Sequence, residues 1–293
     1  MENKSGKTDW HIHTQASDGV YSLNEILNKA QQAGLTEIAV TDHDTMDSWH
    51  ELTQKRCPLI PLTVTSGVEF GAHLSESEWE KEEVHILGYG LDPTQDELRF
   101  ILEKLAKDRK ERFSALLGRA SQLGYPISEE VLENVLPKDS VPGRLHLARI
   151  LVESGYFSSI PEVFQDYLAA GKPGYIGRFR QSPQEICRLI KNAGGVAILA
   201  HPYEIKSKRL RDYLLESDLL DGVEAFHPSH GPLESEKLLE WSRKWGKLTS
   251  GGSDFHGLKS RFPNELGIFY PPSEAIQPFL SRIEESPYRY YLG

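Results

Sequence analysis

Two histidines near the start of the chain are separated by a single residue. His11 and His13 lie in the stretch DWHIHTQASDGVYS, which continues through a glycine turn into a predicted helix. In an extended strand, side chains at positions i and i+2 point to the same face, so both imidazoles can converge on one point while Ile12 faces the opposite layer. This spacing suits a metal ion, but two surface histidines on an edge strand would show it as well.

Other residues of the types that bind metals follow predicted strands along the whole chain. Asp254 and His256 in GGSDFH repeat the i, i+2 spacing of the first pair. Single residues follow the strands in TDHDT, TSGVEF, ILAHP and EAFHP, and they are His43, Glu69, His201 and His227. His85 differs, because it precedes the apolar run ILGYG, and a strand that begins at the top of a barrel or a bent entry would bring it to the same place.

This set of imidazoles and carboxylates is too large for one tetrahedral zinc ion, which takes four ligands. It suits two or three divalent ions, and a carboxylate such as Glu69 can bridge two of them. A mixed nitrogen and oxygen set without thiolate suits manganese, iron or zinc, with geometry and availability deciding between them. Manganese is the metal we expect first, and magnesium is a further alternative. Asp44 is expected to cap the following helix instead, and His50 and His73 are expected at the surface.

Short β-branched runs alternate with longer helical patterns. The runs predict strands, and they cover roughly residues 9–13, 37–42, 63–68, 85–89, 196–200, 222–226 and 247–251. Helices between them have clear N-terminal signals: Ser22 with Glu25, and Ser182 with Pro183 and Glu185. Strand–helix–strand repeats indicate a parallel sheet covered by helices, and the number of units favours a barrel over an open sheet.

One segment interrupts this alternation. Residues 95–170 are charged and helical with no convincing strand, so they are expected to form a helical insertion over the active site. The barrel would then comprise residues 1–94 and 171–293. In barrels of this class the chemistry gathers at the carboxyl ends of the strands, which is where the predicted ligands fall.

The composition of the chain limits its partners and surroundings. The 293 residues are 39% hydrophobic and 26% charged, as in an ordinary globular protein, and the formal net charge of -10 argues against binding of long nucleic acid. No apolar run approaches the roughly 20 residues of a membrane helix. Two cysteines offer neither a disulfide framework nor a zinc spacing, and we expect a cytoplasmic protein.

Several motifs together resemble one family. The stretches DWHIHTQASDG, VTDHDT, GVEF, HILGYG, AHP and GGSDFHG are similar, in order, to the motifs of the polymerase and histidinol phosphatase (PHP) family of metal-dependent phosphoesterases. GRLHLARIL, YLAAGKPGYI and AGGVAILAHP resemble the branch that contains the 3',5'-nucleotide bisphosphate phosphatases and the exonuclease RNase AM. The resemblance implies an α/β fold, a distorted (β/α)7 TIM-like barrel.

The resemblance also implies three metal sites. One would use His11, His13, Glu69 and Asp254, a second would share Glu69 with His85 and His201, and a third would use Asp18, His43 and His256. Every one of these positions holds a suitable ligand in this chain.

We expect cationic and histidine side chains near the predicted site to bind the substrate, because phosphate needs fixed hydrogen-bond donors besides the metals. Arg144 and His146 in PGRLHLAR come first, followed by Lys172 and Arg178 in GKPGYIGR. The alternative is that Arg144 caps a helix or lies at its solvated surface, and that the ring of His146 packs against the same helix. His227 in EAFHPSH is a candidate to donate a proton or hold a phosphate, and His230 is a weaker candidate for the same role.

The function expected from these observations is metal-dependent hydrolysis of phosphate monoesters of small nucleotides. The expected reaction removes the 3'-phosphate of nucleoside 3',5'-bisphosphates, with 5'-3' exonuclease action on short RNA in addition. Histidinol phosphate phosphatase and cyclic phosphate phosphodiesterase are alternatives that would use the same metals. A non-catalytic, metal-binding accessory module is an alternative of another class.

Overall fold

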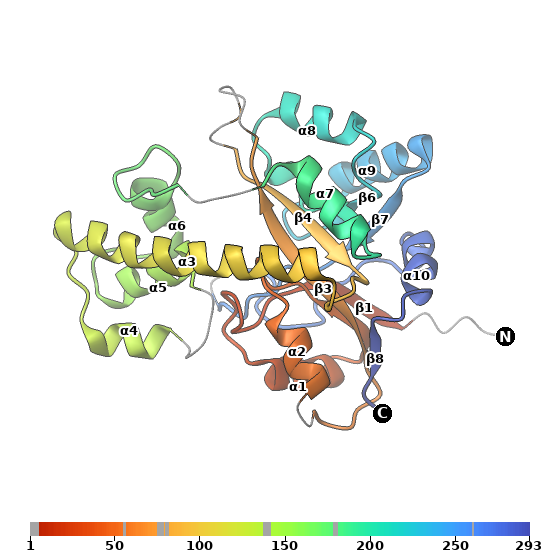
Figure 1. Cartoon of the computed structure of the whole chain (residues 1–293), viewed down its shortest axis with the longest axis horizontal. Coiled ribbons are helices and arrows are strands. Elements are labelled where there is room, and N and C mark those ends of the chain that lie inside the picture. Colours follow the sequence, from red (N-terminus) through yellow and green to blue (C-terminus); the bar gives the residue numbers. More distant parts are fainter. Residues whose placement is uncertain are drawn as a thin grey trace.

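The strands lie side by side in the order in which they occur in the sequence (Figure 1). The computed structural model describes residues 6–54, 57–74, 79, 82–136, 142–177, 181–259 and 261–293. The strands that form this path are β1 (Lys7–Ile12), β2 (Leu35–Val40), β3 (Thr63–Ala72), β4 (Val84–Tyr89), β5 (Val196–Leu199), β6 (Gly222–Phe226) and β7 (Leu248–Gly251). Each overlaps a strand predicted from the sequence.

The sheet is parallel except at β4. Strands β1 to β3 pair in parallel, as do β5 to β7, but β4 runs antiparallel to both β3 and β5. The described residues between β3 and β4 include no helix and the two strands pair antiparallel, so the expectation of an all-parallel sheet is wrong at this strand. Beyond the end of β7, Phe255 pairs with Ile12 at the end of β1 and brings the two edges of the sheet together.

Helices cover the outside of the sheet. They are α1 (Leu23–Gln32), α2 (Asp47–Gln54), α7 (Pro183–Asn192), α8 (Lys208–Glu216), α9 (Pro232–Trp245) and α10 (Gln277–Glu284), with a short turn η2 (Pro202–Glu204) after β5. The predicted N-terminal signals are confirmed, because Ser22 forms a capping box with Glu25 and Ser182 forms one with Glu185. Such a cap stabilises a helix by about 1 kcal/mol.

Asp44 does not cap a helix. The helix that follows it, α2, begins only at Asp47, and the Asp44 carboxylate instead accepts the N–H of Gly71 and pairs with Arg109. The expectation for Asp44 is therefore wrong, because long-range contacts outweigh the local capping signal. His50 and His73 are half-buried and lie outside the candidate metal groups found among the described residues.

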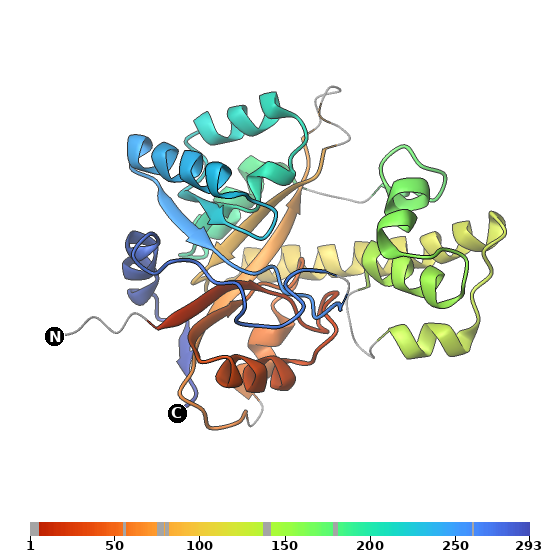
Figure 2. The same ribbon diagram turned by 180° about the vertical axis from the view of Figure 1, so that it is seen from behind.

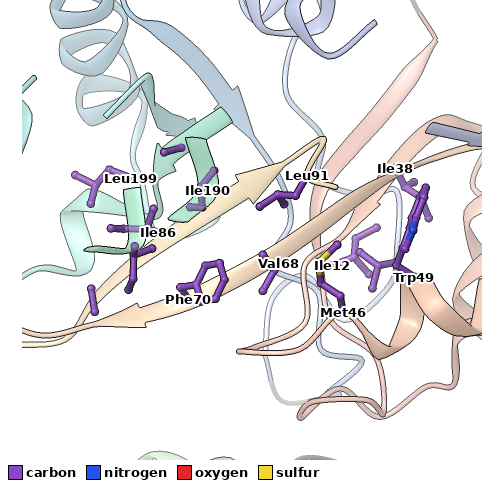
Figure 3. Packing of buried hydrophobic residues seen from close by; sticks show 14 of the residues in the cluster. Ile12, Ile38, Met46, Trp49, Val68, Phe70, Ile86, Leu91, Ile190 and Leu199 are labelled. Atoms are coloured by element: carbon purple, nitrogen blue, oxygen red, sulfur yellow. The ribbon is translucent and has the colours of Figure 1, made fainter. Parts of the chain in front are cut away.

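Apolar side chains pack on both faces of the strands. The larger core lies between the strands and the surrounding helices, where Ile38, Met46 and Trp49 pack at one end and Ile86 and Leu199 at the other (Figure 3). A second group fills the interior at the amino ends of the parallel strands, and it includes Trp10, Tyr89, Ile198 and Phe279.

A short strand that the sequence analysis missed, β8 (Arg289–Tyr291), pairs antiparallel with β3.

Residues between β4 and β5 form a helical arm. It comprises α3 (Asp96–Gln122), α4 (Glu129–Val135), α5 (Arg144–Glu153), α6 (Ile160–Val163) and the π-helical turn η1 (Phe164–Leu168). The arm projects to one side of the sheet, away from both termini (Figures 1 and 2). From Phe113 onward its buried apolar residues, among them Leu147 and Leu168, form a hydrophobic cluster separate from that of the barrel, whereas Leu98 and Leu105 at the start of α3 pack in the barrel core.

Candidate metal centre

Strand alternation turns polar side chains into the barrel interior at one end. Along β4, Tyr89 and Leu87 belong to the inner apolar group, and the next inward position is His85. Because β4 runs antiparallel to its neighbours, its first residues lie where the other strands end. This explains why His85 precedes its apolar run while His201 follows one, and yet both reach the same place.

Glu69 lies at the centre of the polar residues. Its Oε2 is 3.2 Å from His13 Nε2 and 2.9 Å from His43 Nδ1, while its Oε1 is 2.8 Å from His85 Nδ1 and 3.0 Å from His201 Nε2. The side chain is 1% exposed. The two oxygens of one buried carboxylate thus face different sets of imidazoles, which is the geometry of a bridging ligand.

The first group that can hold an ion consists of His11, His13, Glu69 and Asp254. Their ligand atoms all lie within 4.8 Å of one another, and Asp254 Oδ1 is 3.3 Å from His11 Nε2 and 3.1 Å from His13 Nε2. Both ends of the sequence therefore supply walls of one site, as the repeated i, i+2 spacing suggested.

The second group contains Glu69 again, together with His43, which the sequence analysis had assigned only to the third site. His43, Glu69 and His85 have ligand atoms within 4.8 Å of one another, and His201 Nε2 lies 3.3 Å from His85 Nδ1. His201 has a backbone φ of 24°, which is unusual for a residue with a side chain.

The third group lies on the far side of His13. Asp18, His43 and His256 converge there together with His13, which the sequence analysis had assigned only to the first site. Asp18 Oδ1 is 3.3 Å from His256 Nε2, and Asp18 Oδ2 is 3.8 Å from His43 Nε2. Every predicted ligand thus lies in one contiguous polar assembly, which we call the candidate metal centre.

The donor set fits divalent cations. Among the described residues, four of its buried atoms have no hydrogen-bond partner, although they lie close to the opposite ligands: His11 Nε2, His13 Nε2, Asp18 Oδ1 and Glu69 Oε2. Buried polar atoms in proteins are nearly always hydrogen-bonded, so a group of exceptions that converge on common points needs another partner. Imidazole nitrogen and carboxylate oxygen are the ligands that zinc, manganese and iron accept.

The charges of the centre also favour cations. Burial opposes ionisation of Glu69, yet His43, His85 and His11 hold the pKa of its carboxyl well below the ordinary value. Burial likewise works against protonation of His13 and His85, but neighbouring carboxylates raise their pKa values to about 9 and about 10. The carboxylates therefore stay ionised at neutral pH and attract positive charge.

Two further carboxylates orient the ligands, and the sequence analysis missed both roles. Glu224 in β6 is fully buried; its Oε1 lies 2.9 Å from His11 Nδ1 and its Oε2 accepts the N–H of His201 at 2.8 Å. Asp42 accepts hydrogen bonds from the backbone N–H of Thr14 and the hydroxyl of Ser17, which fixes the loop that carries Asp18. A single charged residue inside an apolar strand, as in GVEAF, was the available signal for Glu224.

The second oxygen of Asp254 faces away from the ligands. Its Oδ2 pairs with the guanidinium of Arg261 and lies 3.4 Å from His227 Nε2. The N–H of Ser229 donates to His227 Nδ1 at 3.1 Å, so in the neutral ring the proton is on Nε2 and points at Asp254. Among the described residues, His227 is not part of the cavity wall and is 2% exposed.

A cavity of about 400 Å³ opens onto the centre. The barrel side of its wall includes Glu69, His85, His201 and Asp254, and Arg261 lies beside them. The arm supplies the opposite side with cationic and apolar residues, namely Arg109, Arg112, Arg144, Leu145, Ile160, Pro161 and Phe164. The lining thus combines the acids and histidines of the candidate metal centre with arginines from the arm.

The predicted substrate residues are distributed unevenly around this cavity. Arg144 lines it and pairs with Glu83. Three others are not among its described lining residues: His146 is buried beneath the start of α5, His230 is half-buried behind His227, and Lys172 is exposed just after the arm. Arg178 lies outside the described residues.

Comparison with known proteins identifies the family. Residues 9–176 match the PHP domain, which is more than half of the chain. The chain belongs to the PHP family. It is accordingly a metal-dependent phosphoesterase, and the family predicted from the sequence motifs is confirmed.

Curated relatives of this PHP protein cover most of its length. A 3',5'-nucleoside bisphosphate phosphatase of Chromobacterium violaceum is 30% identical over 92% of both chains. The 5'-3' exoribonuclease Rnm of Escherichia coli is 30% identical over 85% of this chain and 84% of its own. A phosphoribosyl 1,2-cyclic phosphate 1,2-diphosphodiesterase of Eggerthella lenta is 27% identical over 87% of this chain and 96% of its own.

A solved structure confirms the fold expected for the family. A protein from Bifidobacterium adolescentis that is assigned as a metal-dependent phosphoesterase superposes with a TM-score of 0.78 at 29% identity, over 96% of this chain and 98% of its own. The distorted TIM-like barrel is thereby confirmed. In the described part of this PHP protein, no helix has the length and apolar character needed to cross a membrane.

Proposed function

We propose that this enzyme removes the 3'-phosphate from nucleoside 3',5'-bisphosphates. The observation that carries the proposal is the cavity, in which the candidate metal centre faces a wall with arginines from the arm. A substrate with two phosphate groups fits such a cavity, one group at each wall. The volume of about 400 Å³ lies in the range of small-molecule sites. The 30% identity with a 3',5'-nucleoside bisphosphate phosphatase supports the same assignment.

The proposal includes two or three divalent ions, with manganese as the first choice and iron, zinc or magnesium as alternatives. Such ions supply Lewis acidity that neutralises charge on phosphoryl oxygens. The residues that would hold them are His11, His13, Asp18, His43, Glu69, His85, His201, Asp254 and His256. Glu224 orients His11, and His227 together with Arg261 orients Asp254.

Arg144 is proposed to bind the phosphate that is not hydrolysed. Its guanidinium carries five N–H donors in a planar fork, a geometry that matches phosphate. The arm, residues 95–170, would thus be a substrate-recognition insertion in a barrel formed by residues 1–94 and 171–293. Exonucleolytic cleavage of short RNA from the 5' end is the second candidate function, supported by the identity with the E. coli exoribonuclease.

A parallel assay tests the substrate assignment. Manganese-loaded protein is given adenosine 3',5'-bisphosphate, adenosine 3'-monophosphate, histidinol phosphate, a cyclic phosphate and a short 5'-phosphorylated RNA under identical conditions. We expect the bisphosphate to have the highest kcat/KM.

Arg144→Ala should raise KM for the bisphosphate by about tenfold or more and affect the 3'-monophosphate much less. Arg188→Ala is the matched control, because Arg188 also pairs with a glutamate but is exposed on α7. Turnover of RNA or histidinol phosphate with an inert bisphosphate would contradict the proposal.

A further inference from the structure

Arg109 lies where α3 passes from the barrel to the arm. Leu105, one turn earlier, packs in the hydrophobic core of the barrel, and Phe113, one turn later, packs in that of the arm. Arg109 itself is 7% exposed, although it stands in the highly charged run KDRKERF. A buried guanidinium between two apolar cores needs anionic or carbonyl partners.

The partners of Arg109 belong to the segment that carries a candidate metal ligand. Nη1 lies 2.8 Å from Asp44 Oδ2 and donates to the backbone carbonyl of His43 at 3.2 Å. Asp44 is fully buried and is the residue directly after His43. Nη1 of Arg109 therefore contacts both the backbone carbonyl of His43, a candidate metal ligand, and the carboxylate of the next residue, Asp44.

This segment adopts a backbone conformation that needs support. Asp44 has a φ of 55°, in the left-handed region that side chains other than glycine rarely adopt. Its N–H donates to the carbonyl of Glu69 at 2.9 Å, and its Oδ1 accepts the N–H of Gly71 at 3.1 Å. The carboxylate of Asp44 is thus fixed on one side by β3 and on the other by Arg109.

The other side of Arg109 touches the start of α5. A Cβ placed on Gly143 would lie only 2.6 Å from Arg109 Nη2, so the guanidinium fills the space beside the residue that precedes Arg144. Arg109 is therefore in contact with both walls of the cavity, His43 on the barrel side and the start of α5 on the arm side.

We propose that Arg109 is a positioning residue that holds His43 in place for metal binding and couples this ligand to the arm. Arg109 does not itself bind the metal; it acts through Asp44 and through the carbonyl of His43. The inference concerns the metal centre and stands whether or not nucleoside bisphosphates are the substrate.

Direct titration with Mn²⁺ of the full-length, metal-free protein tests this inference, with free Mn²⁺ measured by electron paramagnetic resonance. Removal of residues that orient metal ligands typically weakens metal binding by about 10–100-fold, so Arg109→Met should weaken at least one Mn²⁺ equivalent by about tenfold or more. Arg109→Lys should restore most of the affinity, because an ammonium can replace the two contacts made by the single Nη1 atom. Arg119→Met is the matched control: Arg119 lies on the same helix, and its Nε donates to a backbone carbonyl at 3.0 Å.

Wild-type Mn²⁺ binding by Arg109→Met would overturn the proposal, as would an equal loss in Arg119→Met. A failure of Arg109→Lys to recover any affinity would also count against it. If Arg109→Met does not fold, Asp44→Asn replaces it, because the amide oxygen can still accept the N–H of Gly71 while the charge opposite Arg109 is lost. Weaker Mn²⁺ binding by folded Asp44→Asn then supports the proposal, and unchanged binding overturns it.

Discussion

His11 and Glu224 form a fully buried pair in which Nδ1 of the imidazole lies 2.9 Å from Oε1 of the carboxylate. An ionised carboxylate only accepts hydrogen bonds, so Nδ1 of His11 carries a proton, and in the neutral ring the lone pair is on Nε2. That Nε2 is directed at Glu69 and Asp254, 3.4 Å and 3.3 Å away. Glu224 therefore selects the tautomer of His11 that can bind a metal ion.

Replacing Glu224 tests this relationship. Glu224→Gln removes the charge that orients Nδ1–H, and we expect metal affinity and phosphoesterase activity to fall by about 10–100-fold. Metal content after dialysis against a graded series of chelator concentrations provides the measurement. Glu234→Gln in the first turn of α9 serves as the control and should behave as wild type. Wild-type metal retention by Glu224→Gln would mean that His11 needs no such partner.

Much of the centre could be predicted because metal ligands carry a local signal. Histidines and acids at the ends of apolar runs are visible in the sequence, and the fold brings strand ends together at one edge. His85 shows the limit of this rule. Its position before an apolar run is ambiguous until the antiparallel direction of β4 is known, and that direction is set by pairing with β3 and β5.

The residues that orient the ligands were harder to find. Arg109 stands among charged neighbours on α3, and no pattern distinguishes this buried cation from exposed cations such as Lys107. The capping prediction for Asp44 considered only the following helix, whereas its partners Gly71 and Arg109 lie 27 and 65 residues away. Strand β8 has only three residues, too few to show periodicity.

Gly143 offers a second way to disturb Arg109. Gly143→Ala places a Cβ 2.6 Å from Arg109 Nη2, so the guanidinium must shift from its position against Asp44 and His43, and we expect weaker metal binding and lower kcat. Gly231→Ala is a closely matched control. Gly231 also precedes a helix, and its Cβ would meet the flexible end of Glu234 at 2.6 Å, which can swing aside. Equal metal affinity and equal kcat in the two variants would contradict the expectation.

His146 makes the stability of the arm depend on pH. Burial lowers the pKa of His146 to about 4, with Asp18 opposing the shift and Arg149 and Arg109 adding to it. The unfolded chain takes up this proton below the ordinary pKa of 6.5 while the folded chain resists it until about pH 4. This contribution is therefore fully present above pH 6.5 and is lost as the pH falls toward 4, at a cost of about 3 kcal/mol.

Urea unfolding at pH 7 and pH 4 measures this loss. The free energy of unfolding should fall by less in His146→Leu than in the wild type, because leucine takes up no proton. An identical fall in both proteins would show that His146 does not cause the dependence.

His227 is expected to position Asp254, and the leaving group of the substrate distinguishes this role from proton donation. Loss of a proton donor slows nucleotide hydrolysis far more than hydrolysis of p-nitrophenyl phosphate, whose leaving group needs no proton. Loss of a positioning residue slows both to a similar extent. We expect His227→Ala to reduce kcat for both substrates by about tenfold. A selective effect on the nucleotide would assign proton donation to His227.

The central claim is that the convergent histidines and acids around Glu69 hold divalent ions. Anomalous diffraction at the manganese edge, from crystals soaked in Mn²⁺, tests it most directly. We predict peaks on both sides of Glu69, one enclosed by His11, His13 and Asp254 and another by His85 and His201, with a third beside Asp18 and His256. Anomalous peaks only elsewhere on the protein, or none in crystals of an active, manganese-stimulated preparation, would contradict it.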